Sequence, residues 1–426
     1  MNAAVQRAVT VAALAFGVVL TSALPVAAHE PGDLDRSFGG DGITTVNFGD
    51  RDSAFSLFAT SSGRVTLGGV SGETLPRKIA ATRLDQHGHL DRSFGTNGRL
   101  LIEAGDDHPY VSAWTSDPEA RYLVLGERES RRGASNGFYL MRLTANGRVD
   151  GTFGNQGSIK GRLARGDHLM ADVLALPAGD IVVLGEAGRY TYIKAYTSRG
   201  ALKSSFGENG VVRIPNIWAS ALLYHPSGTI LVVGAHNDKL VVHALKPTGE
   251  IKRSFGENGW ARINVDVGDG YLIPSNAVIV DSQGRIVVAA EGDSAFISDT
   301  IVGRFKPDGR PDESFGANRA WIRRDIGNID SPNAIVELPN GRLIVVGHVQ
   351  QDRFGDDLSA DLLLLGLRPN GKRWRDFGAG GVVRRDFGMK DSFVNGSDAR
   401  LIEGRLVVAG SAAGNMLAAR FFVDSE

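Results

Sequence analysis

Acidic and imidazole side chains recur in the short links that join one group of apolar runs to the next. The residues in question are Asp52, Asp107, His108, Asp167, His168, Asp269, Asp330 and Asp391. Carboxylates and imidazoles gathered on one surface could hold a cation or act as acid and base. An Asp next to Gly also forms ordinary turns by capping nearby amides. Both interpretations stay open, and we assign neither a catalytic residue nor a metal site from these positions.

The overall composition limits the classes of function. The chain has 426 residues, a net charge of −1 from 47 Lys and Arg against 48 Asp and Glu, and no Cys. A near-neutral chain is not expected to bind nucleic acid, which needs a basic stripe. Without Cys there are no disulfides, thiolate nucleophiles or cysteine metal sites.

A repeated motif defines the elements that must position these side chains. The sequence Gly-x-Leu-Asp-x-Ser-Phe-Gly-x-x-Gly at 32–42 returns at 88–98. Weaker copies centre on Phe153, Phe206, Phe255, Phe315 and Phe377. Seven copies about 57 residues apart indicate a solenoid or a propeller.

Each repeat contains four short apolar runs separated by turn residues. In one repeat the runs are 53–60, 65–67, 78–84 and 99–103. Such spacing predicts a four-stranded antiparallel meander, and no segment shows a sustained helical period. First strands favour a small residue at one aligned position, such as Ser56, Ala334 or Ser397, whereas Asp172 departs from this rule.

We therefore predict an all-β fold, a seven-bladed β-propeller of four-stranded antiparallel blades that spans residues 29–426. An open β-solenoid is the alternative, but it would need capping units. The strand at 43–48 should pair antiparallel with 416–422 and complete the last blade as its outer strand. This pairing would close the propeller and cover a free edge.

Residues 1–28 read as a signal peptide. Arg7 precedes an apolar run that ends near Leu24, and Val26-Ala27-Ala28 offers small residues for cleavage. A retained membrane anchor is the competing interpretation, although the run is at the lower limit for a span. Cleavage after Ala28 would give a protein that is secreted or held in the periplasm or cell envelope, with no membrane span left.

The motif resembles the bacterial delta-60 repeat family. The resemblance rests on Leu34-Asp35-Arg36-Ser37-Phe38-Gly39 with a trailing Gly, and it extends over residues 32–423. It implies a β-propeller without an assigned biochemical activity, so no catalytic residues are carried over. Arg319 stands where the last Gly of the sixth copy is expected, and Asp376 replaces Ser in the seventh.

The aspartates of the motif admit a structural and a ligand-binding interpretation. Asp35, Asp91, Asp150 and Asp312 share one position, where other copies have Lys203, Lys252 and Trp374. A cation loop would not tolerate those replacements, so the structural role is favoured.

The links between repeats should share one face of the propeller, where Asp52, Asp107, Asp167, Asp269, Asp330 and Asp391 would ring the channel. We expect an exported noncatalytic binding or interaction module, monomeric, whose partner is an unknown protein or a small cationic ligand. Weak binding of Ca²⁺ is the one cofactor considered. The alternative is an exported hydrolase or lyase that uses the face bearing Asp and His.

Overall fold

The computed structural model describes residues 29–60, 62–73, 77–103, 109–129, 135–164, 169–268, 270–294, 297–350, 359–387 and 394–424. Over these residues the protein is all-β, with 28 strands and no helix. The strands form five sheets of four strands and one sheet of eight. Within the described ranges no helix is present that has the length and apolar character needed to cross a membrane.

Four sheets are built from consecutive antiparallel strands. They are β2 (Asp52–Ala59), β3 (Val65–Ser71), β4 (Lys78–Leu84) and β5 (Arg99–Ile102); β6 (Pro109–Ser116), β7 (Tyr122–Glu129), β8 (Ser135–Leu143) and β9 (Ser158–Gly161); β10 (Leu169–Ala175), β11 (Ile181–Ala187), β12 (Tyr190–Tyr196) and β13 (Val211–Pro215); and β14 (Trp218–His225), β15 (Thr229–His236), β16 (Lys239–Leu245) and β17 (Trp260–Asn264).

The eight-stranded sheet consists of two such meanders joined at one point. Its strands are β18 (Tyr271–Val280), β19 (Ile286–Ser294), β20 (Ile297–Phe305), β21 (Trp321–Arg324), β22 (Ile329–Glu337), β23 (Leu343–Gln350), β24 (Ala360–Leu367) and β25 (Val382–Arg385). The junction is a single parallel bridge between Ser298 of β20 and Ile329 of β22. Asp299 and Asp330 directly follow the two bridged residues, so this contact brings them into one neighbourhood.

The remaining sheet joins the two ends of the chain. It contains β26 (Asn395–Ile402), β27 (Arg405–Ala412), β28 (Asn415–Phe422) and β1 (Ile43–Val46). β1 pairs antiparallel with β28, from Ile43 opposite Ala419 to Val46 opposite Met416. The predicted antiparallel pairing of 43–48 with 416–422 is therefore found for Ile43–Val46 with Met416–Ala419, and β1 ends before Asn47.

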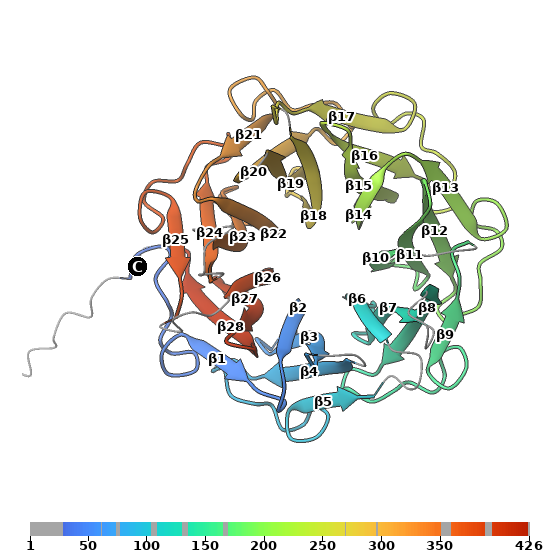
Figure 1. The fold of residues 1–426 in the computed structure, drawn as a ribbon, viewed down its shortest axis with the longest axis horizontal. Helices are drawn as coiled ribbons and strands as arrows, with labels where there is room; N and C mark the ends of the chain where they lie inside the picture. Colours follow the sequence, from blue (N-terminus) through green and yellow to red (C-terminus); the bar gives the residue numbers. More distant parts are fainter. Residues whose placement is uncertain are drawn as a thin grey trace, which may run out of the picture.

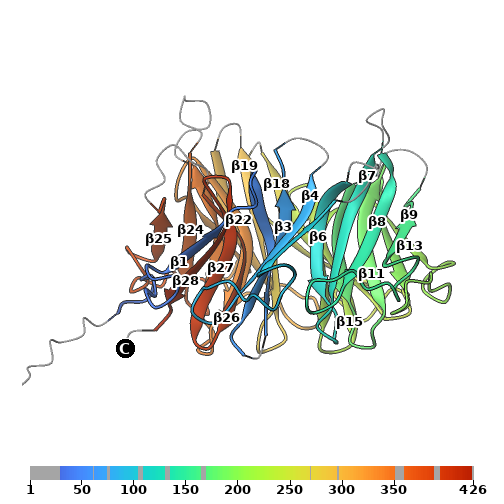
Figure 2. The same cartoon turned by 90° about the horizontal axis from the view of Figure 1, so that it is seen from below.

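The sheets are arranged around a central axis, with the first strand of each meander innermost and the fourth outermost (Figure 1). Seen from the side, the strands run roughly across the thickness of the molecule and the connections gather at its two faces (Figure 2). The first strands line a central cavity of about 300 Å³. This arrangement follows from the sequence, because runs such as Ile181–Leu184 are buried on both faces between neighbouring sheets.

A bulge in the first strand sets which side chain faces the cavity. Asp172 and Asp398 both follow a bulge and oppose the residue just before the Gly of their second strands, Leu184 and Ala409. The alignment that put Ser397 at this position was therefore off by one residue. Asp172 accepts a hydrogen bond from the Leu222 N–H at 2.7 Å, and Asp398 accepts one from the Leu57 N–H at 2.9 Å. Each carboxylate thus links its own sheet to the next one.

The sixth motif copy keeps the turn despite Arg319. Ala320, one residue later, donates its N–H to the Phe315 carbonyl at 3.0 Å and has φ of 63°. In the second copy Gly98 bonds the Phe94 carbonyl in the same way. The loop is one residue longer, and Ala320 takes the left-handed conformation that Gly adopts elsewhere.

Candidate functional site

The motif aspartates are occupied by structural contacts. Asp150 accepts a hydrogen bond from Arg142 Nε at 2.8 Å and another from Thr152 Oγ1 at 2.6 Å. The Arg142 guanidinium also lies 4.6 Å from the centre of the Phe153 ring. The Thr152 hydroxyl, followed by its N–H and the arginine charge, lowers the pKa of Asp150 against the effect of burial.

Three further copies repeat this arrangement. The pairs are Arg83–Asp91 at 2.8 Å, Arg304–Asp312 at 2.7 Å and Arg420–Asp35 at 2.8 Å. Where the motif has Lys203, Lys252 or Trp374, the third strand has Ala195, Ala244 or Gly366 in place of the arginine. The carboxylate and the guanidinium are thus present together or absent together, and a ligand-binding role for these aspartates is not supported.

Of the eight link residues considered from the sequence, the structure describes two. Asp107, His108, Asp167, His168, Asp269 and Asp391 lie outside the described residues. Asp52 and Asp330 are both fully buried. Each accepts, through Oδ2, the N–H of the residue four positions earlier at 2.7 Å.

The surroundings of these two aspartates differ. Asp52 lies beside Asp50, and burial, followed by the Asp50 charge, raises its pKa. Asp330 lies beside Asp299 and Asp325, and these three residues are called the acidic cluster below. Each offers one carboxylate oxygen, and these oxygens lie within 4.8 Å of one another.

Sequence reasoning missed Asp299 and Asp325. Asp325 belongs to a short pattern that a closer comparison would have found. The pattern consists of an Asp or Asn, an apolar residue and a Gly, which stand five, four and three positions before the link aspartate. It occurs at 47–52, 325–330 and 386–391. Nothing in the sequence marks Asp299, because it joins the cluster through the tertiary bridge between Ser298 and Ile329.

The acidic cluster contains buried oxygens without partners. Asp299 is 2% exposed and Asp330 is 0% exposed, whereas Asp325 is exposed. Arg323 Nε bonds Asp299 Oδ2, but Oδ1 of Asp299 and Oδ1 of Asp330 have no hydrogen-bond partner in the described structure. Burial, then the charges of Asp299 and Asp325, raise the pKa of Asp330 to about 7.

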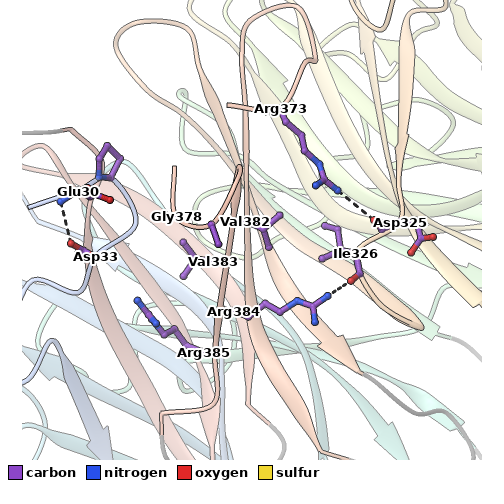
Figure 3. A pocket seen from close by; sticks show the side chains of 12 residues that line it. Glu30, Asp33, Asp325, Ile326, Arg373, Gly378, Val382, Val383, Arg384 and Arg385 are labelled. Carbon is purple, nitrogen blue, oxygen red and sulfur yellow. Dashed lines mark hydrogen bonds between the residues drawn. The ribbon is translucent and has the colours of Figure 1, made fainter. Parts of the chain in front are cut away.

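Two arginines approach the same link through its backbone. Arg384 donates to the Ile326 carbonyl, and Arg373 donates to the Asp325 carbonyl at 3.4 Å (Figure 3). These residues line a cavity of about 580 Å³ between β25 and the N-terminal segment, which contributes Glu30. The arginines thus position the link without bonding its carboxylates.

A second cavity adjoins the first and shares Asp325 and Arg373 with it. It has a volume of about 730 Å³ and is called the basic recess below. Its lining comprises six cationic side chains and one acidic one, namely Arg323, Arg324, Arg368, Lys372, Arg373, Arg375 and Asp325. The recess lies between β21 and the turn that joins β24 to β25.

The cations of the basic recess are only partly neutralised. Arg324 donates to the Gly371 carbonyl at 2.7 Å, which fixes the side chain without supplying a negative charge. Burial, followed by repulsion from Arg373, lowers the pKa of Arg324. Arg368, Lys372 and Arg375 are exposed. An anionic group placed here would relieve the repulsion.

Comparison with known proteins identifies the fold. Residues 121–153, which include β7, β8 and the first part of one motif copy as far as Phe153, match the family model described as a domain of unknown function (DUF5122) β-propeller. No curated protein matches the chain.

Among the solved structures that align with the chain, one with a TM-score above 0.5 supports the fold. A catalytically inactive histidine-to-alanine variant of virginiamycin B lyase from Staphylococcus aureus, with quinupristin, aligns with a TM-score of 0.53 and 10% identity, covering 89% of this chain and 99% of that one. The β-propeller domain of the Trilobed protease from Pyrococcus furiosus aligns with a TM-score of 0.43 and 10% identity, covering 89% and 96%. The chain has a β-propeller fold. At 10% identity the lyase structure carries no information on activity.

Proposed function

We propose that the protein is an exported, noncatalytic binding module that holds anionic groups of its partner in the basic recess. The observation that carries this proposal is the set of six cationic side chains around one cavity, against one carboxylate in the lining and Asp299, which pairs with Arg323. Guanidinium groups pair with carboxylates, sulfates and phosphates through fixed, often bidentate geometry. The scaffold consists of hydrogen-bonded sheets, which suits recognition at low entropic cost.

The architecture proposed for this module is a closed seven-bladed propeller of delta-60 repeats. Support comes from the pairing of β1 with β28 and from a hydrogen bond that recurs at every motif copy. In each copy the Gly after Phe donates its N–H to a turn carbonyl of the next repeat, as Gly95 does to Asn146 at 2.9 Å. The last of these bonds runs from Gly378 to Pro31 at 2.8 Å, which joins the seventh copy back to the first.

Binding of a sulfated polysaccharide tests the function. We expect dextran sulfate to bind the protein at low salt, to be released at high salt, and to be recovered with unchanged chain length. Neutral dextran should not bind. Dextran sulfate of reduced length after incubation would contradict the noncatalytic role.

A pair of matched variants tests the location. Replacing Arg368, Lys372 and Arg375 by Ser should weaken binding by about tenfold or more, from three exposed charge contacts of roughly 0.5 kcal/mol each. The control replaces Arg36, Arg92 and Arg253 by Ser, which are exposed residues at the motif position of Arg375 in other copies. The control removes the same charge and should bind as the wild type does. Equal weakening in both variants would remove the basic recess from consideration.

The enzyme alternative has no observation in its favour from the described residues. It requires Asp and His to converge, and His108 and His168 lie outside the described residues. The prediction of convergence therefore stays a prediction.

A further inference from the structure

We propose that the acidic cluster of Asp299, Asp325 and Asp330 is a Ca²⁺ site. The three carboxylates offer oxygens within 4.8 Å of one another. Ca²⁺ binds oxygen ligands at about 2.3–2.6 Å, so one ion can contact oxygens that far apart. Mg²⁺, at about 2.0–2.1 Å with strict octahedral geometry, fits such a spread less well.

A cluster of acids alone would not define a site, and two buried oxygens supply the second observation. Oδ1 of Asp299 and Oδ1 of Asp330 belong to residues at most 2% exposed, yet neither has a hydrogen-bond partner in the described structure. A buried carboxylate oxygen that is left unpaired is costly. A cation that contacts both would remove this cost.

The orientation of the carboxylates agrees with this role. Their other oxygens are engaged, since Asp330 Oδ2 accepts the Ile326 N–H and Asp299 Oδ2 accepts Arg323 Nε. Oδ1 of Asp330 faces the link segment that contains Gly327, since a Cβ placed on Gly327 would stand 3.4 Å from this oxygen. Asp325 lies two residues before Gly327 in the same link. One oxygen of its exposed carboxylate lies within 4.8 Å of an oxygen of the buried Asp330.

The same link at another place in the chain shows what a version with amides in place of two of the three carboxylates looks like. Asn47 and Asn415 occupy the positions that correspond to Asp325 and Asp299, and Asp52 corresponds to Asp330. Here Asn47 Nδ2 donates to Asn415 Oδ1 at 2.6 Å, so the residue in the place of Asp299 has its Oδ1 partnered, whereas Asp52 Oδ1 lacks a partner as Asp330 Oδ1 does. The turn therefore does not need the two additional carboxylates, and their presence in the acidic cluster calls for a different role.

Calcium titration of the chain that begins at His29 tests the inference. After treatment with a chelator, CaCl₂ at saturating concentration should raise the melting temperature by about 2–4 °C or more, with a smaller effect of MgCl₂. The heat of Ca²⁺ binding should be measured in parallel by calorimetry.

The decisive variant is Asp299→Asn combined with Asp325→Asn, because it converts the cluster into the amide arrangement that the chain already uses. It should fold, as judged by its circular dichroism. Its heat of Ca²⁺ binding should be smaller than that of the wild type, because the contribution of the acidic cluster is absent. Asp52→Asn is the matched control, since it alters a buried aspartate with the same 2.7 Å backbone bond and should keep the Ca²⁺ response. Identical Ca²⁺ heats for the wild type and the double variant would overturn the inference, as would a wild type that does not respond.

The reciprocal variant adds a gain of function. Asn47→Asp combined with Asn415→Asp should create a second acidic cluster around Asp52 and add one bound Ca²⁺ per chain. No added Ca²⁺ in a folded variant would contradict the ligand geometry inferred for the cluster. The acidic cluster shares Asp325 with the basic recess, but the Ca²⁺ titration contains no anionic polymer, so a failure with dextran sulfate leaves the Ca²⁺ result unaffected.

Discussion

In each sheet, the third-strand residue beside the motif decides what the motif aspartate does; it lies eight positions before the motif position in six copies, and for Asp35 it is Arg420 of β28. Four repeats place an arginine there, and the carboxylate forms an ion pair and accepts the Ser or Thr two residues later. Three repeats place Ala or Gly there and have no motif aspartate. A buried carboxylate without its partner would be strongly destabilising, which explains why both change together.

Removal of one arginine should expose this dependence. Arg142→Ala leaves Asp150, which is 8% exposed, without its charge partner and should lower the free energy of unfolding by about 3–5 kcal/mol. Adding Asp150→Asn should recover part of this loss because the orphaned charge is removed. Chemical denaturation measures both. Arg213→Ala, in an exposed pair with Glu208, should cost less than about 1 kcal/mol.

His243 should make stability depend on pH. Burial, with a smaller contribution from the charge of Arg262, lowers its pKa to about 4, and its ring lies 4.1 Å from that of Trp260. The unfolded chain has a His pKa near 6.5, so between about pH 6.5 and 4 it binds the proton more readily than the folded protein. Stability from this residue is therefore complete above about pH 6.5 and is lost as pH falls toward 4.

The variant His243→Phe keeps an aromatic ring against Trp260 and removes the titration. Melting temperatures of wild type and variant, compared from pH 4 to 7.5, should diverge as the pH falls, with the variant less sensitive to acid. A constant difference across this range would show that His243 is not the group responsible.

At the scale of the strands, the sheet formed by β26, β27, β28 and β1 is the element on which the proposed closure depends. β1 contributes four paired residues, and Phe38 of the preceding motif is 1% exposed. Arg420 of β28 also bonds Asp35 in that motif. The N-terminal segment is therefore fixed to the C-terminal strand by pairing, packing and charge.

Deletion of residues 30–48 should lower the melting temperature by about 10 °C or more, from the loss of a buried Phe and of the edge strand. The comparison protein begins at His29 and retains the strand. Calorimetry of the two would decide, and equal melting temperatures would count against closure by β1.

At the scale of the whole molecule, seven repeats with no Cys give a structure whose stability comes from stacking of sheets. Its melting temperature should therefore not change on addition of a reducing agent. The residues before His29 lie outside the described structure, and export stays a prediction from their sequence.

Expression in a bacterial host tests export. The protein recovered outside the cytoplasm should begin at His29 when its N-terminus is sequenced. Recovery of intact Met1 in that fraction would instead favour a retained anchor, and recovery only from the cytoplasm would contradict export.

The sequence by itself determined the repeat, the four strands of each unit and the pairing of the terminal strands. These features depend on local patterns and on periodicity, and both can be read directly from the sequence. It also indicated a structural role for the motif aspartates, although the partner of Asp35, Arg420, lies 385 residues away.

Only the tertiary structure decided which charges meet. Asp299 joins Asp330 because two neighbouring meanders touch at Ser298 and Ile329, and the basic recess forms because β21 lies beside the turn after β24. Side chains from different repeats converge through the stacking of sheets, and the spacing of residues along the chain does not encode that distance. The sequence therefore predicted the scaffold, but of the acidic cluster it indicated only Asp330.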